Sequence, residues 1–343
     1  MQFGLFGGAT AQHGVVSDSQ LYSDFIDYVC EAEELGFKSV FLVEHHFTGM
    51  GQVSSSLSLL AYLAARTRTI RLGTAVVVLP WHNPALLAEQ VATIDLLSNG
   101  RFDFGIGRGY RNNEFAGFCI PMEEANERYQ EALEFLRKAW TSEGRFSHHG
   151  KRWNFEDIII EPPPVQLPHP PMWVGAGNVD VIRSVGQQGF NLLLDQFASA
   201  EVIGERISAY RDSVEKSGGI YRGERVGLTR ALCLAHTPHE REAAIQARAK
   251  FVLGAQALAA NPKTGAIPGL AMATNVEELR KATEAEGLIG TPEEIIGRLQ
   301  RLQRAGVENV LLLDVLGSRE TLRTFAREVM PVFAERSPAV AAQ

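Results

Sequence analysis

Three titratable side chains stand together in FLVEHHFTGM, residues 41 to 50, directly after a short apolar run. Glu44, His45 and His46 could bind a metal ion, transfer protons, or form a polar loop with no role. Adjacent residues of a strand point to opposite faces, and no HxH or HExxH spacing occurs nearby, so a metal site is disfavoured. Because histidine titrates near neutrality, acid-base chemistry is the better functional interpretation; a structural role for one of the pair is the alternative.

Two glycine-rich stretches could bind an anion. In GRGYRNN, residues 107 to 113, glycines flank Arg108 and would let it approach a phosphate closely, although an ordinary surface arginine is the alternative. GAGN, residues 175 to 178, precedes a helix whose first turn would offer free backbone N–H groups. Taken alone, GAGN is better explained as an ordinary turn. GIGRGY does not match the dinucleotide fingerprint, because Tyr110 stands where GxGxxG has its third glycine.

Eight strand-helix units are predicted to position these residues. The strand-like runs are QFGLFGG, SVFLVEHH (39–46), IRLGTAVVVLP (70–80), RFDFGIGRG (101–109), PMWVGAG, FNLLLDQ, RVGLTRALCLAH and VENVLLLDVL, and each is followed by a helical pattern. Near-continuous apolar strands in that number predict an α/β fold of the closed (β/α)8 TIM barrel type. The chemistry of such a barrel lies at the carboxyl ends of its strands, so EHH, GRGYRNN and GAGN are expected to share one pocket.

The chain is predicted to form a single domain over residues 1–343. Segment 141–170 is expected to be an excursion between units four and five, and 254–290 a lid inserted near the C-terminal part. A net charge of -7 without a basic tract argues against nucleic acid as a partner. The absence of a leader or a long apolar run, and three widely spaced cysteines, predict a cytoplasmic protein.

Several stretches together resemble the bacterial luciferase-like flavin-dependent monooxygenases, from MQFG to EVMP at 328–331. They are EHHFTGMG, LGTAVVVLP, NPALLAEQVATIDLLSNGRFDFGIGRG and GTPEEIIGRLQRLQRAGVENVLLLDVLGSRETL. The resemblance implies a barrel, usually dimeric, that binds reduced FMN supplied by a separate flavin reductase. It further implies that O2 forms a peroxyflavin, which oxygenates a small organic substrate.

The resemblance also assigns roles to residues of this chain. It implies His45 as the catalytic histidine, with Glu44 and His46 supporting it, and Arg108 as a phosphate ligand. A phosphate loop is implied at Gly177 and Asn178, with Val181 in the following turn. The segment matching Ala75 and Val76 is implied to contain a non-proline cis peptide against the flavin ring.

Two positions depart from the luciferase pattern. Gly107 stands where luciferase has a reactive cysteine beside the flavin, so light emission is not implied. A second phosphate arginine aligns with Asn126, and Arg128 lies two residues further on as a candidate substitute. Gly107, Asn126 and Arg128 therefore complete the expected cofactor site, while no metal is expected.

Two rival functions remain open at this stage. One is a hydride-transferring oxidoreductase of the same fold that uses a deazaflavin, and the other is a noncatalytic flavin-binding accessory protein; the EHH group speaks against the latter. SSLSLLAYLAART and NPALLAEQVATIDLL are apolar around more than one face, so Leu59, Leu63 and Leu87 are expected to be partly exposed unless a partner covers them. A homodimer is predicted, with covering loops of the same chain as the alternative.

Overall fold

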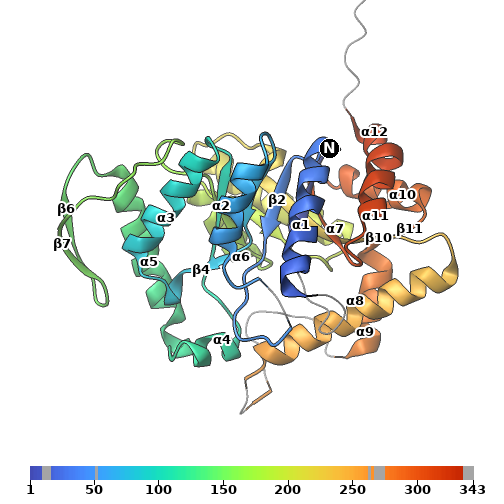
Figure 1. The fold of residues 1–343 in the computed structure, drawn as a ribbon, viewed down its shortest axis with the longest axis horizontal. Helices are drawn as coiled ribbons and strands as arrows, with labels where there is room; N and C mark the ends of the chain where they lie inside the picture. The colour runs from blue at the N-terminus through green and yellow to red at the C-terminus, as the bar shows by residue number, and fades with distance from the viewer. Residues whose placement is uncertain (10–16, 51–52, 262–263, 266–274, 335–343) are drawn as a thin grey trace, which may run out of the picture.

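Eight parallel strands close into a barrel in the described part of the chain (Figure 1). The computed structural model describes residues 1–9, 17–50, 53–261, 264–265 and 275–334. Each barrel strand pairs in parallel with the next, and the last pairs with the first, which confirms the predicted (β/α)8 architecture. In order around the barrel they are β1 (Gln2–Gly7), β2 (Ser39–Leu42), β3 (Arg71–Thr74), β5 (Phe102–Gly107), β8 (Met172–Gly175), β9 (Asn191–Leu194), β10 (Val226–Leu234) and β12 (Asn309–Asp314).

Helices surround this barrel and begin where the sequence supplies capping residues. Asn83 accepts hydrogen bonds from the N–H groups of Ala85 and Leu86, and Pro84 occupies the first helical position, as predicted. The covering helices are α1 (Asp18–Glu34), α2 (Ser56–Arg66), α3 (Pro84–Leu97), α5 (Ala125–Thr141), α6 (Val179–Gln187), α7 (Ala200–Lys216), α8 (Pro238–Ala259), α10 (Pro292–Arg304), α11 (Arg319–Thr324) and α12 (Met330–Phe333). Short helical turns are α4 (Asn112–Gly117), η1 (Leu79–Trp81), η2 (Met122–Glu124), η3 (Gly223–Arg225) and η4 (Phe325–Val329).

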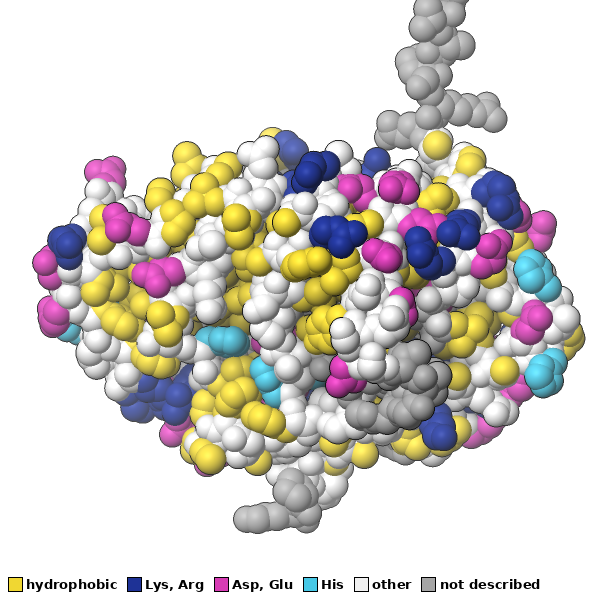
Figure 2. All heavy atoms as spheres, in the orientation of Figure 1, with side chains coloured by type: hydrophobic (Ala, Val, Ile, Leu, Met, Phe, Trp, Pro, Cys, Tyr) yellow, Lys and Arg dark blue, Asp and Glu magenta, His cyan; other side chains and the backbone are white. Residues whose placement is uncertain are grey.

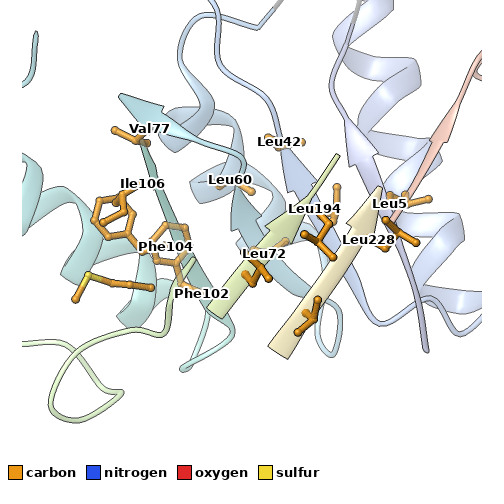
Figure 3. Packing of buried hydrophobic residues seen from close by; sticks show 14 of the residues in the cluster. Leu5, Leu42, Leu60, Leu72, Val77, Phe102, Phe104, Ile106, Leu194 and Leu228 are labelled. Carbon is orange, nitrogen blue, oxygen red and sulfur yellow. The ribbon is translucent and has the colours of Figure 1, made fainter. Parts of the chain in front are cut away.

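The barrel strands bury side chains on both faces. Outward-facing residues such as Leu72, Phe104 and Leu228 pack under the helices in the main core (Figure 3). Inward-facing Phe41, Trp173, Leu193 and Leu311 fill the barrel interior, with Phe6, Ala75 and Val76 packed against them. Burial on both faces explains why these strands have continuous apolar sequences rather than alternating ones.

Two strands end earlier than predicted. The run 39–46 was expected to be one strand, but β2 ends at Leu42, so Glu44, His45 and His46 lie in the loop after it. The run 70–80 is divided into β3 and β4 (Val77–Val78) by a cis peptide bond between Ala75 and Val76, the bond that the resemblance implied. Polarity explains the end of β2, because its titratable side chains leave the sheet to find polar partners.

The two segments outside the repeat form separate additions. Within 141–170, β6 (Phe146–His149) and β7 (Asn154–Ile158) form an antiparallel hairpin that projects at the left of Figure 1. Within 254–290 lie the end of α8, then α9 (Val276–Glu286) and β11 (Leu288–Gly290), a short strand paired with β10. Residues 262–263 and 266–274 of the predicted lid lie outside the described residues. No helix in the described ranges combines the length and apolar character needed to cross a membrane.

Helices α2 and α3 do expose apolar side chains, but the prediction named the wrong leucines. Leu59, Leu63 and Leu87 are buried, because both helices pack against the barrel and against each other through these side chains. The exposed apolar residues of these helices are Tyr62, Leu86, Leu96 and Leu97. Hydrophobic side chains gather over α2 and α3 on the face shown in Figure 2.

Candidate active site

The histidine pair is bound to a buried glutamate that sequence reasoning missed. Glu114 of α4 lies 3.0 Å through Oε1 from Nδ1 of His45, and it accepts a hydrogen bond of 3.0 Å from the backbone N–H of His46. The side chain of Asn113 in the same helix donates to the carbonyl of His46 at 3.2 Å. Helix α4 therefore fixes the loop after β2, and the carboxylate of Glu114 selects the His45 tautomer with its proton on Nδ1.

Glu44 forms a second buried carboxylate centre beside the first. Its Oε2 accepts hydrogen bonds from the backbone N–H and the hydroxyl of Ser56, at 3.1 and 2.6 Å. Its Oε1 lies 3.4 Å from Nε2 of His46 and 3.7 Å from Nε2 of His82. Ser56 begins α2 and His82 follows η1, so Glu44 connects three segments at the rim of the barrel.

The environments shift the pKa values of both groups downward for different reasons. Burial would raise the pKa of Glu44, but the hydrogen bonds from His46 and Ser56 and the nearby ring of His82 outweigh it and lower the pKa to about 2. Burial lowers the pKa of His45 below its usual value, and the Glu114 carboxylate opposes that shift only in part. At neutral pH the site therefore contains an ionised Glu44 and a neutral His45 whose Nε2 can accept a proton.

An aromatic cluster surrounds the ring of His46. The ring centroids of Phe118 and Trp81 lie 5.0 and 6.0 Å from that of His46, both edge to face. Trp81 also stacks on Phe118 at 5.0 Å, and its edge contacts Phe115 at 5.2 Å. These rings keep water away from one side of the His46 and Glu44 pair.

Glycines of β5 let the chain after β3 approach closely at the barrel mouth. A Cβ atom at Gly107 would lie 2.5 Å from Cγ2 of Val76, and one at Gly105 would lie 1.8 Å from the carbonyl oxygen of Thr74. The hydroxyl of Thr74 also donates to the carbonyl of Gly105 at 2.8 Å, which holds β3 against β5. No larger side chain fits at Gly107 unless Val76 moves, so the reactive cysteine of luciferase has no room here.

The proposed phosphate ligands have polar groups without partners. Arg108 follows β5, is exposed, and has no hydrogen-bond partner among the residues that the structure describes. After β8, the backbone N–H groups of Gly177, Asn178 and Val179 likewise donate to no described residue. The N–H of Val181 is used differently from what we expected, since it donates to Oδ1 of Asn178 at 3.3 Å. Three successive free N–H groups at the start of a helix suit an anion.

The remaining predicted cofactor residues lie at the start of α5 and show no feature of a phosphate site. Asn126 is exposed, and Nε of Arg128 donates to Oε2 of Glu124 at 2.9 Å. Arg128 is thus held by the carboxylate of the residue that precedes α5. Neither side chain is brought into contact with the other predicted site residues by the hydrogen bonds of the described chain.

The predicted catalytic and phosphate residues occupy the same end of the barrel. His45 and Arg108 both follow carboxyl ends of parallel strands, and α4, which begins four residues after Arg108, carries the glutamate that contacts His45. Ser56, His82 and Glu114 were missed from the sequence. Glu114 could have been found from its place six residues after Arg108, whereas Ser56 and His82 have no sequence signal of their own.

A closed barrel with a histidine and carboxylate site at the carboxyl ends of its strands defines a TIM-barrel enzyme. The family model described as luciferase-like monooxygenase matches residues 1–309, and the chain belongs to that family. No finer name follows from this match, because members of the family differ in substrate and cofactor.

Three similar proteins show how broad the family is. The chain is 27% identical to the oxygenase component of a flavin-dependent trigonelline monooxygenase of Acinetobacter baylyi, over 98% of this chain and 96% of that protein. It is 32% identical to an F420-dependent glucose-6-phosphate dehydrogenase of Kineococcus radiotolerans, over 56% of this chain and 58% of that protein. The crystal structure of monooxygenase RslO1 from Streptomyces bottropensis matches with a TM-score of 0.79 and 27% identity, over 97% of this chain and 100% of that one.

Proposed function

We propose that this protein is the oxygenase component of a two-component monooxygenase that uses reduced FMN and O2 to oxygenate a small organic substrate. The observation that carries the proposal is the common location of the His45 site, Gly107 and Arg108 at one barrel mouth, where Arg108 has no partner among the described residues. The trigonelline monooxygenase, a flavin-dependent oxygenase component, aligns over nearly the whole chain and supports it.

The residues at the mouth fit a phosphorylated flavin. Arg108 and the N–H groups of Gly177 and Asn178 would hold the phosphate, while Gly107 and the Ala75–Val76 peptide would lie against the ring. A bound, reduced flavin would supply the electrons for oxygen activation. Val76 packs directly on Gly107 and offers an apolar surface to a flat ring, whereas Arg108 and the N–H groups of Gly177 and Asn178 suit a phosphate.

The remaining residues of the site would control protons and water. Because Nδ1 of His45 carries its proton toward Glu114, Nε2 is left to accept a proton from the substrate or cofactor. Glu44 stays ionised and orients His46. The aromatic rings around His46, and α8, whose Ala259 carbonyl accepts a hydrogen bond of 2.7 Å from Asn112 in α4, would limit water entry. Both helices lie at the lower edge of the molecule in Figure 1.

Anaerobic titration with reduced FMN, followed by oxygen-dependent turnover with a flavin reductase, tests this function. We expect binding of reduced FMN and substrate oxygenation that stops when either oxygen or the reductase is omitted. The F420-dependent relative favours a second candidate, deazaflavin-dependent hydride transfer. The alignment to that relative covers only 56% of this chain, so FMN is preferred; tighter binding of reduced F420, with oxygen-independent turnover, would replace the proposal by this candidate.

We further propose that two copies associate through α2 and α3. Tyr62, Leu86 and Leu97 are 51, 57 and 59% exposed, which is unusual for three large apolar residues on adjacent helices. Light scattering should give a dimer mass for the wild type and a monomer mass for Leu97→Lys. A monomeric wild type at working concentration would contradict this proposal without affecting the cofactor site.

A further inference from the structure

The guanidinium of Arg206 lies beside the unpartnered turn after β8. A Cβ atom built on Gly177 would be 3.5 Å from Nη2 of Arg206 and 3.7 Å from Oδ2 of Asp195. Arg206 belongs to α7, which packs along α6, and its side chain is only 16% exposed. The turn and the guanidinium therefore form one local site, although they come from different helices.

Asp195 holds this guanidinium in place through only one of its nitrogens. Nη1 of Arg206 donates to Oδ2 of Asp195 at 2.5 Å, whereas Nη2 donates to no described residue. Asp195 is fixed in turn by the N–H groups of Phe197 and Ala198, at 2.9 and 3.0 Å from its Oδ1. The fork of Arg206 is thus oriented by the protein and keeps donors for a further acceptor.

Two guanidinium groups lie near the turn, and each is paired with a carboxylate. Arg230 is fully buried, and its Nη1 donates to the backbone carbonyl of Asp195 at 3.0 Å. Burial would raise the pKa of Asp195, but hydrogen bonds from Phe197 and Arg206 outweigh it and lower the pKa, so the carboxylate stays ionised. Nη2 of Arg230 lies 3.9 Å from the carboxylate of Glu286, so Arg206 is the guanidinium with a donor left beside the turn. The start of α6 adds the positive end of a helix dipole.

We propose that Arg206 is a second cationic ligand of the flavin phosphate and that it determines the preference for a phosphorylated over an unphosphorylated flavin. This inference rests on the proposed function. The resemblance to luciferase implied a second phosphate arginine at the position of Asn126, and that position carries no charge in this chain. Arg206 would supply a cationic donor in place of that arginine, with its Nη2 close to Gly177 of the phosphate turn.

Calorimetric titration of the whole protein with reduced FMN and with reduced riboflavin, under anaerobic conditions, tests the inference. The ratio of the two dissociation constants isolates the phosphate contribution. We expect Arg206→Gln to weaken FMN binding about tenfold or more, as for a lost charge-assisted hydrogen bond, and to leave riboflavin binding unchanged. Arg211→Gln removes the same charge from an exposed site on the same helix and is the matched control. It should change neither constant by more than about twofold.

A second variant should change FMN affinity in the opposite direction. Its result does not depend on whether Arg206→Gln folds. Asp195→Asn removes the carboxylate that neutralises Arg206, so the released guanidinium should bind FMN more tightly and leave riboflavin binding as before. Equal losses for FMN and riboflavin in Arg206→Gln, or unchanged FMN binding in Asp195→Asn, would overturn the role of Arg206. If the wild type does not prefer FMN over riboflavin, the proposed FMN site itself fails, and this inference with it.

Discussion

The ends of β2 and β8 use polar groups in opposite ways. After β2, Glu44 and Glu114 are bonded to two histidines, a serine and backbone N–H groups, all within the protein. After β8, the N–H groups of Gly177, Asn178 and Val179 have no partner among the described residues. The two carboxylates of the first region are buried and hydrogen-bonded, whereas the N–H groups of the second region donate to no described residue.

This difference separates two kinds of site within one barrel mouth. A site that must hold one protonation state needs fixed partners and low water access, because both shift pKa values. A site that must bind an anion needs donors that are not already used, since an occupied N–H group would have to break a hydrogen bond first. Mutations should therefore reduce stability in the β2 region and ligand affinity in the β8 region.

Replacement of Glu44 should cause the largest loss of stability. Its folded pKa of about 2 lies below the unfolded value of 4.5, so the stabilisation is present above pH 4.5 and is lost as the pH falls through 2. That shift corresponds to about 3 kcal/mol at neutral pH. Urea unfolding should show Glu44→Gln less stable than the wild type by about 2 to 3 kcal/mol at pH 7, with a difference that narrows toward pH 2.

Glu34→Gln is the matched control, because Glu34 is exposed at the end of α1. We expect that variant to stay within about 0.5 kcal/mol of the wild type. A Glu44→Gln protein that is as stable as the wild type across this pH range would contradict the view that the β2 region is stabilised by its internal pairing.

Replacement of Arg108 should lower the affinity for FMN and leave the stability unchanged. The side chain is exposed and unpartnered in the described chain, so Arg108→Gln should leave the free energy of unfolding unchanged. A hydrogen bond to a charged group contributes about 1.5 to 3 kcal/mol, so FMN affinity should fall about tenfold to a hundredfold. Fluorescence titration with FMN measures this loss of affinity. Arg145→Gln, at an exposed arginine next to the hairpin, is the matched control. An equal loss for riboflavin would show that Arg108 does not contact the phosphate.

The sequence predicted the barrel because its signals are local. Each strand-helix unit has its own apolar run and capping residues, as at Asn83 and Pro84, so the number of units and the shared end of the barrel follow directly. The cis peptide at Ala75–Val76 followed only from the family resemblance, since no local pattern marks it.

Partners that are distant in sequence could not be predicted in this way. Glu114 reaches His45 across 69 positions of the chain, and Arg206 lies near Gly177 only because α6 and α7 pack together. The leucines of α2 and α3 were misjudged for the same reason, because helix-to-helix packing decides which side of an apolar helix stays exposed.

Glu114 offers a smaller and more specific test of the β2 region. Its carboxylate opposes the effect of burial on His45, so Glu114→Gln should lower the pKa of His45 further. A lost hydrogen bond is worth about 1 kcal/mol, so this shift should be smaller than the stability change at Glu44. Nitrogen-15 NMR of the imidazole groups can follow the titration and report the tautomer. A raised pKa, or an unchanged tautomer population, would mean that Glu114 does not control His45.

Replacement of Arg128 should have the smallest effect on FMN affinity. It distinguishes Arg128 from Arg206 as the source of the second positive charge. The pair of Arg128 with Glu124, the residue before α5, is a partly exposed i,i+4 contact worth about 0.3 to 0.5 kcal/mol. If Arg206 is the second phosphate ligand, Arg128→Gln should change FMN affinity by less than about twofold, since an uninvolved surface charge is largely screened. If instead Arg128 leaves Glu124 to bind the phosphate, the same variant should lose FMN affinity about tenfold while Arg206→Gln loses little. Titration of both variants with FMN and riboflavin, side by side, therefore decides which arginine compensates for Asn126.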